Sequence, residues 1–138
     1  MATIRKIIEL NAPAAKVWEA LADFQNVHTR VAPGFLLGSE PDGDKARIVH
    51  FANGSKARET MVTADAAHRR LVYFIAASER IAHHNASAEI VADGANRCRF
   101  IWTTDVLPDA LAPYIDGQMN EGAMAMKAAL ERRAVTGG

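Results

Sequence analysis

From residue 35 to residue 106 the sequence consists of short β-type segments separated by turn signals. Within the segments apolar residues alternate with polar ones, as in strands whose successive side chains point to opposite faces. The turns fall about every ten residues and read Pro-Asp-Gly-Asp, Ala-Asn-Gly, Asp-Ala-Ala-His and Asp-Gly-Ala-Asn. Frequent turns of this kind predict antiparallel strands that are joined as a meander.

Helical patterns stand on both sides of this region. Residues 13–23 carry apolar side chains at helical spacing, and residues 26–33 read as a further helical turn or loop. The last predicted element is a helix over residues 109–133, about seven turns and roughly 37 Å long at 1.5 Å per residue. The predicted strands are residues 3–11, 35–40, 45–51, 55–64, 71–78, 83–92 and 97–106.

This order of elements predicts one α+β domain over residues 1–138. A curved antiparallel sheet of about seven strands is expected to wrap around the long C-terminal helix, with two short helices after the first strand. Such a sheet must cover one of its faces, and only the long helix is large enough to do so. Because the helix cannot fill the whole concave face, we expect a ligand cavity between the two.

The composition disfavours several classes of protein. Lys plus Arg equal Asp plus Glu at 16 each, so the formal net charge is zero, whereas a general nucleic-acid binder carries a basic excess. No apolar run approaches the ~18 residues of a membrane span. No secretory signal is recognisable, so we expect a cytoplasmic protein, as a monomer or homodimer. The single cysteine, Cys98, excludes an internal disulfide.

Metal and cofactor motifs are not found either. His83 and His84 are neighbours on a predicted strand, so their side chains point to opposite faces and cannot chelate one ion together. The sequence contains no phosphate-binding glycine loop, dinucleotide-binding motif, serine elbow or zinc-protease motif. We therefore expect neither a metal nor a cofactor.

Several segments, in their order and spacing, resemble the START-like (SRPBCC) helix-grip superfamily, in particular its polyketide cyclase/dehydrase branch. The segments are APAAKVWEALADFQN, RIVHFANGSKARETMV, DAAHRRLVYFI, FIWTTDV and EGAMAMKAALE. The resemblance covers nearly the whole chain. It implies a hydrophobic cavity between the sheet and the C-terminal helix that binds lipids, hormones, polyketide intermediates or other small apolar molecules. It implies no single chemistry, because members of the superfamily include carriers, receptors and cyclases.

Glu59 is the residue that most needs explaining. On the predicted strand 55–64 it alternates with the charged Lys56 and Arg58, and so shares a face with Ala57 and Met61. An unpaired ionised carboxylate on an apolar inner face is expensive. Pairing with a cation would make Glu59 tolerable, either as a polar anchor in the cavity or as a salt bridge open to solvent at the strand end.

The turn that precedes this strand leaves two registers open. A two-residue Asn-Gly turn would place Ile48 opposite Glu59, whereas a three-residue Ala-Asn-Gly turn would place Arg47 there. We favour the three-residue turn, because it puts the apolar Val49 and Phe51 inside and agrees with the pattern of the superfamily.

The same alternation selects the residues that we expect to contact a ligand. Glu59 and His84 are also the candidate catalytic groups, as general acids or bases. The predicted ligand-binding residues are Arg47, Val49, Phe51, Glu59, Met61, Tyr73, Ile75, His84, Trp102, Tyr114, Gln118 and Gly122.

Two functions are compatible with this set. The first is binding of a small hydrophobic or aromatic molecule, which needs only apolar walls and one or two polar anchors. The second is a cyclase or dehydratase activity on a polyketide-like substrate. That chemistry would use Glu59 or His84 as the base, with Arg47, Tyr73 or Tyr114 stabilising a developing enolate.

Overall fold

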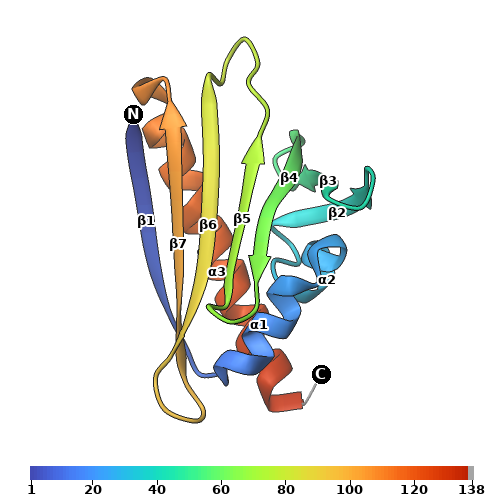
Figure 1. Ribbon diagram of the computed structural model, residues 1–138, viewed down its shortest axis with the longest axis vertical. Helices are drawn as coiled ribbons and strands as arrows, with labels where there is room; N and C mark the ends of the chain where they lie inside the picture. The colour runs from blue at the N-terminus through green and yellow to red at the C-terminus, as the bar shows by residue number, and fades with distance from the viewer. Residues whose placement is uncertain (137–138) are drawn as a thin grey trace.

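The computed structural model describes residues 1–136 and has the predicted order of strands and helices (Figure 1). A seven-stranded sheet lies across α3, while α1 lies in the lower part of the view and α2 at the right, below β2. The strands are β1 (Ala2–Leu10), β2 (Leu36–Pro41), β3 (Ala46–Phe51), β4 (Lys56–Asp65), β5 (Arg70–Ile75), β6 (His83–Ala92) and β7 (Cys98–Leu107). The helices are α1 (Ala14–Ala22), α2 (Val27–Arg30) and α3 (Ala112–Thr136), with 3-10 turns at Phe24–Asn26 and Asp109–Leu111.

The sheet has the order β1-β7-β6-β5-β4-β3-β2, and every neighbouring pair is antiparallel. The strands from β2 to β7 therefore follow one another in space as they do in sequence, and β1 pairs with β7 at the far edge. This confirms both the meander and the helix-grip fold that the turn spacing predicts.

The C-terminal helix begins later than the sequence pattern indicates. Residues 109–111 form a 3-10 turn, and α3 itself starts at Ala112. Pro113 lies in its first turn, where the missing N–H of proline breaks no helical hydrogen bond. No helix of the described residues is both long and apolar enough to span a membrane.

The core lies between the concave face of the sheet and α3, with α1 at one end. Alternate residues of the central strands face into it, as the buried Ala86, Ala88 and Ile90 of β6 illustrate. Gly122 marks a point of close approach between α3 and the sheet. A Cβ atom at this position would come within 3.0 Å of the Trp102 ring and 3.2 Å of Phe35.

Glycine-to-alanine exchanges at the two glycines of α3 test this contact. Gly117 faces open space, so Gly117→Ala should raise the free energy of unfolding by about 1 kcal/mol through helix propensity. Gly122→Ala has the same propensity gain, but its methyl group must displace Trp102 or Phe35. We expect chemical denaturation to show a clearly smaller gain, or a loss, for Gly122→Ala. Equal gains for the two variants would contradict the close packing.

Candidate functional site

The turn between β3 and β4 sets the register of the site. Phe51 and Ser55 flank the three residues 52–54, and the Phe51 N–H donates to the Ser55 carbonyl at 2.8 Å. Gly54 has a φ of 91°, a left-handed conformation that glycine adopts without strain. Arg47 consequently lies opposite Glu59. The three-residue turn is confirmed, and the two side chains share the inner face of the sheet.

Arg47 and Glu59 form a buried ion pair. Their side chains are 4% and 9% exposed. The Nε and Nη2 atoms of Arg47 both lie 2.8 Å from the same carboxylate oxygen, Oε1 of Glu59. The alternative of a salt bridge open to solvent is therefore wrong. Burial removes the water that would weaken this attraction, but it also makes the loss of either partner costly.

The remaining contacts of the Arg47 guanidinium also come from protein. Its Nη1 donates to the Phe24 carbonyl at 2.7 Å. Its Cζ lies 3.8 Å from the centroid of the Phe24 ring and 5.4 Å from that of Tyr73, within the range of cation–π attraction. The guanidinium is thus held by Glu59 from β4, by Phe24 from the 3-10 turn and by Tyr73 from β5.

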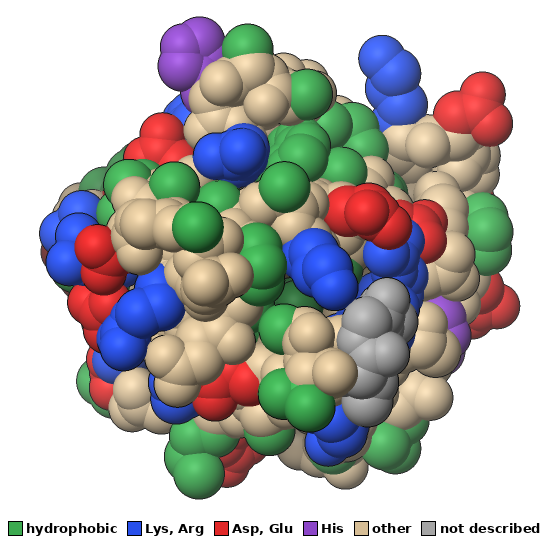
Figure 2. Space-filling model, turned by 90° about the horizontal axis from the view of Figure 1, so that it is seen from below, with side chains coloured by type: hydrophobic (Ala, Val, Ile, Leu, Met, Phe, Trp, Pro, Cys, Tyr) green, Lys and Arg blue, Asp and Glu red, His purple; other side chains and the backbone are tan. Residues whose placement is uncertain are grey.

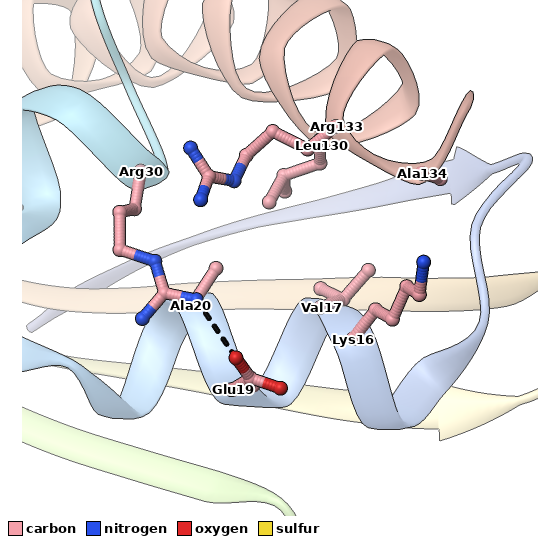
Figure 3. A pocket seen from close by; sticks show the side chains of 8 residues that line it. All are labelled: Lys16, Val17, Glu19, Ala20, Arg30, Leu130, Arg133 and Ala134. Atoms are coloured by element: carbon pink, nitrogen blue, oxygen red, sulfur yellow. Dashed lines mark hydrogen bonds and ion pairs between the residues drawn. The ribbon is translucent and has the colours of Figure 1, made fainter. Parts of the chain in front are cut away.

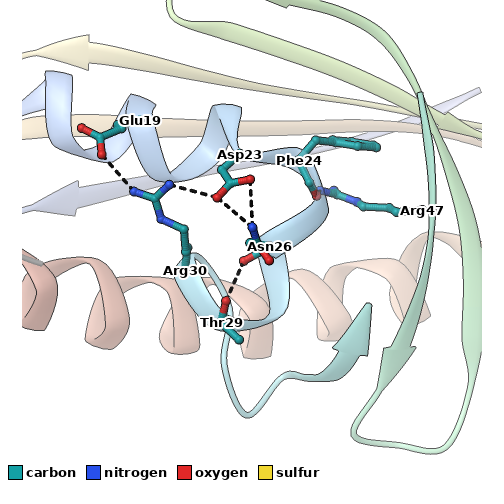
Figure 4. A network of polar contacts seen from close by, with 7 residues as sticks. All are labelled: Glu19, Asp23, Phe24, Asn26, Thr29, Arg30 and Arg47. Atoms are coloured by element: carbon teal, nitrogen blue, oxygen red, sulfur yellow. Dashed lines mark hydrogen bonds and ion pairs between the residues drawn. The ribbon is translucent and has the colours of Figure 1, made fainter. Parts of the chain in front are cut away.

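A polar network on the turn after α1 supports Phe24 (Figure 4). Arg30 donates to Asp23 and to Glu19, each at 3.1 Å, and the Asn26 side chain donates to both Asp23 oxygens. The hydrogen bond from Asn26, followed by the contact with Arg30, lowers the pKa of Asp23. These contacts fix residues 23–26 and with them the carbonyl that receives Arg47.

A second polar pair, formed by Tyr73 and Trp102, lies in the same space. The Trp102 Nε1–H donates to the Tyr73 hydroxyl oxygen at 3.2 Å. Burial raises the pKa of the Tyr73 phenol, and the negative charge of Glu59 raises it further. Tyr73 therefore stays neutral at physiological pH and keeps a proton to donate.

These groups line a cavity between the sheet, the α1–α2 segment and α3. The unfilled space is about 480 Å³, including the part that is open to solvent. Apolar side chains make up most of its wall. The lining residues are Leu21, Val27, Val31, Ala32, Phe35, Leu36, Arg47, Phe51, Glu59, Leu71, Tyr73, Ala88, Phe100, Trp102 and Met126.

Phe35 and Phe51 are the partly exposed members of this wall, since the others are buried. Their rings meet edge to face, with centroids 5.5 Å apart and an interplanar angle of 74°. The two rings therefore flank the side on which the cavity opens.

The polar atoms that face this cavity are few. Oε1 of Glu59 accepts both hydrogen bonds from Arg47, whereas Oε2 has no hydrogen-bond partner within residues 1–136. The Tyr73 hydroxyl accepts from Trp102 and donates to no group in that same part of the chain. The cavity thus offers one acceptor and one donor in an apolar surrounding.

Five of the predicted ligand-binding residues line this cavity, namely Arg47, Phe51, Glu59, Tyr73 and Trp102. The others lie outside its wall. Val49 is fully buried in the core, and Gly122 packs against the Trp102 ring. Met61, Ile75 and Gln118 are half-buried and line no part of the cavity.

Tyr114 departs most from its predicted place. Its side chain is 53% exposed, and its hydroxyl accepts a hydrogen bond from the Asn53 side chain at 3.1 Å. The reason is helix geometry. Each four-residue step along a helix rotates by about 40°, so the stripe through Gly122 and Gln118 has turned away from the sheet at Tyr114.

His84 lies on the inner face but outside the cavity wall. Pairing across the sheet aligns it with Ile75 and Glu59, so about 10 Å of sheet separates the Cα atoms of Glu59 and His84. Its Nδ1 is buried and finds no hydrogen-bond partner in the described chain. Burial lowers the pKa of His84, although the negative charge of Glu59 acts in the opposite direction.

Part of the wall was not predicted. Leu21, Val27, Val31 and Ala32 come from α1, α2 and the residue pair that follows α2. A spacing of four residues between Val27 and Val31 is the signal that a helix turns both side chains inward. Residues 26–33 are too short for that periodicity to identify a helical wall of the cavity.

Two other chemistries find no support in the described residues. Within residues 1–136 no group of three His, Cys, Asp or Glu side chains could hold a metal ion. Cys98 is fully buried, and burial raises the pKa of its thiol to about 11, so it is not a reactive nucleophile.

A second hollow lies between α1 and the C-terminal half of α3 (Figure 3), at the end of the molecule that Figure 2 views. It measures about 380 Å³, again with solvent included, and charged and hydrophobic side chains mix around it. Arg30 in its wall is already held by Glu19 and Asp23, and no aromatic side chain lines it. The interior cavity is therefore the better candidate. The hollow is lined by Lys16, Val17, Glu19, Ala20, Arg30, Leu130, Arg133 and Ala134.

Removing the cation tests the buried ion pair. Arg47→Met should lower the free energy of unfolding by about 3–5 kcal/mol, because Glu59 is left charged and unpaired in the interior. The matched control is Arg58→Met, whose ion pair with Asp42 is about half exposed and should cost less than about 1 kcal/mol. Urea denaturation of both variants measures the difference, and similar losses would contradict the burial of the pair.

The lowered pKa of His84 predicts a pH dependence of stability. The unfolded chain binds a proton near the ordinary pKa of 6.5, whereas the folded protein resists it. The stability from His84 is therefore complete above that pH and is lost as the pH falls through the lower folded value. Urea unfolding between about pH 7.5 and about pH 5 should show a smaller fall for His84→Leu than for the wild type. An unchanged fall in His84→Leu would refute the assignment.

Comparison with known proteins agrees with the observed fold. The sequence model of the family described as polyketide cyclase / dehydrase and lipid transport matches residues 1–133. No curated protein sequence matches the chain.

Solved structures of the same fold are numerous. The solution NMR structure of a Thermobifida fusca protein is 28% identical, with a TM-score of 0.77, over 99% of this chain and 95% of that one. Norcoclaurine synthase from Thalictrum flavum, solved with dopamine and hydroxybenzaldehyde, is 17% identical, with a TM-score of 0.73, over 99% and 88%. A START superfamily protein from Mycobacterium smegmatis is 14% identical, with a TM-score of 0.72, over 99% of both chains.

The family match extends over nearly all of the chain, and the structural neighbours share its sheet and long C-terminal helix. The resemblance drawn from the sequence segments is confirmed. The chain belongs to the family described as polyketide cyclase / dehydrase and lipid transport.

Proposed function

We propose that this protein binds a small hydrophobic molecule, aromatic or lipid-like, in the cavity between the sheet and α3. The observation that carries the proposal is the buried Arg47–Glu59 pair in a wall that is otherwise largely apolar. An apolar wall provides affinity for an apolar molecule, and a few fixed polar groups orient it. We assign ligand contact to Arg47, Phe51, Glu59, Tyr73 and Trp102.

The energetic cost of the pair supports this role. Apolar side chains of similar volume in place of a buried ion pair often leave a protein as stable or make it more stable. A fold that needed only a core would gain nothing from Arg47 and Glu59 at this place. A role in ligand recognition explains the presence of the pair, whereas a contribution to stability alone does not.

The family and one structural neighbour support this class of ligand. The family description includes lipid transport, and the Thalictrum flavum enzyme was solved with two aromatic molecules.

A cyclase or dehydratase activity is the second candidate. It is favoured by one observation, that the free Oε2 of Glu59 and the neutral Tyr73 hydroxyl belong to the same cavity wall, which supplies both a base and a proton donor. His84 lies outside the cavity wall and is the weaker candidate base. Turnover of a polyketide-like substrate that is abolished in Glu59→Gln would distinguish catalysis from binding alone.

Binding is tested by native mass spectrometry of freshly purified protein, followed by extraction and identification of any co-purifying small molecule. Glu59→Gln should weaken the binding of that molecule at least about tenfold, because it removes a charged acceptor inside the cavity. Arg58→Gln is the matched control, since Arg58 is exposed and pairs with Asp42 on the outer face, and it should leave affinity unchanged. Equal and negligible effects of both variants would remove Glu59 from the site.

A further inference from the structure

We infer that the ligand of the interior cavity is a neutral, largely apolar molecule with one hydroxyl group. This hydroxyl group bridges Oε2 of Glu59 and the hydroxyl of Tyr73. Molecules with an acidic group are excluded from the cavity. This inference rests on the binding function proposed above and names the class of ligand.

The acceptor half of the bridge is Glu59. Arg47 directs both of its nitrogens to Oε1, so the second oxygen of the carboxylate is left without a hydrogen bond in residues 1–136. Glu59 lines the cavity and is 7% exposed, so this oxygen is reached from the cavity and has an apolar surrounding. A carboxylate oxygen in such a place is a strong acceptor that favours a ligand with a hydrogen to donate.

The donor half is Tyr73. Its oxygen already accepts from the Trp102 Nε1–H, so the remaining capacity of the hydroxyl is the donation of its own proton. It is not hydrogen-bonded to Glu59, although both residues lie against the same guanidinium, Arg47. A ligand group that accepts from Tyr73 and donates to Glu59 supplies the missing hydrogen bond of each residue. A hydroxyl is the smallest ligand group that does so.

Arg47 explains why an acid is not the ligand. Arginine is the usual partner of a carboxylate, but here its charge is already balanced by Glu59, and three of its five N–H groups donate to Glu59 and to the Phe24 carbonyl. The rings of Phe24 and Tyr73 also lie against the guanidinium, with their centroids 3.8 and 5.4 Å from its Cζ. An anionic ligand would meet the uncompensated oxygen of Glu59 in place of a free cation. The pair as a whole is neutral, so a neutral ligand fits the charge of the cavity.

Three naphthalene derivatives of similar size test the inference by isothermal titration calorimetry at neutral pH. 2-Naphthol donates and accepts, 2-methoxynaphthalene only accepts, and 2-naphthoate is an anion. We expect 2-naphthol to bind the wild-type protein at least about tenfold more tightly than either of the others. Binding of all three with equal affinity, or preference for 2-naphthoate, would overturn the inference while leaving the binding function intact. Failure of all three to bind would overturn the binding function itself.

Two variants locate the preference. In Glu59→Gln the amide oxygen can still accept from Arg47, while an NH₂ group replaces the free oxygen. The variant should therefore bind 2-naphthol and 2-methoxynaphthalene with affinities that differ by a factor of about one. Tyr73→Phe removes the hydroxyl that donates to either ligand, so it should lower both affinities and keep their ratio.

Arg58→Gln, on the outer face, is the control for unchanged affinities. An unaltered ratio in folded Glu59→Gln would refute the role of Oε2. If that variant does not fold, the wild-type series and Tyr73→Phe decide.

Discussion

The ion pair between Arg47 and Glu59 is the interaction on which the interior of this protein depends. One guanidinium connects β3 to β4 through Glu59, to the turn after α1 through the Phe24 carbonyl, and to β5 through the Tyr73 ring. A charge in an apolar interior is tolerated only when it is paired with an opposite charge and hydrogen-bonded. The cavity therefore has its shape because its walls must supply partners for Arg47.

This requirement extends to parts of the chain that never touch the cavity. The Phe24 carbonyl is in place because Asp23, Asn26 and Arg30 fix the backbone of that turn. The position of Glu59 opposite Arg47 depends on the length of the β3–β4 turn, since one residue fewer would move Ile48 into that place. The polar centre thus results from backbone geometry at two turns as much as from the side chains themselves.

Most of the fold, and part of the site, could be predicted from the sequence. Strand alternation and turn spacing identify the meander, because both signals are local. The inward direction of Glu59 follows from the same period of two, and the apolar content of β3 was enough to select the register. Tyr114 was misplaced because a four-residue repeat drifts around a helix of 3.6 residues per turn. The cavity wall formed by α1 and α2, and the position of His84 outside the cavity wall, depend on how elements distant in sequence pack together. No local sequence pattern carries this information.

The edge-to-face contact of Phe35 and Phe51 has a consequence for how fast a bound molecule is exchanged. A molecule that enters or leaves between these two rings breaks a contact worth about 1 kcal/mol. The contact can form again behind the bound molecule. Breaking it therefore lowers the rates of association and dissociation by the same factor and leaves the dissociation constant unchanged. The polar groups that choose the molecule lie elsewhere, on β4 and β5. Residence time and selectivity are therefore governed by different residues, and each can change in evolution without the other.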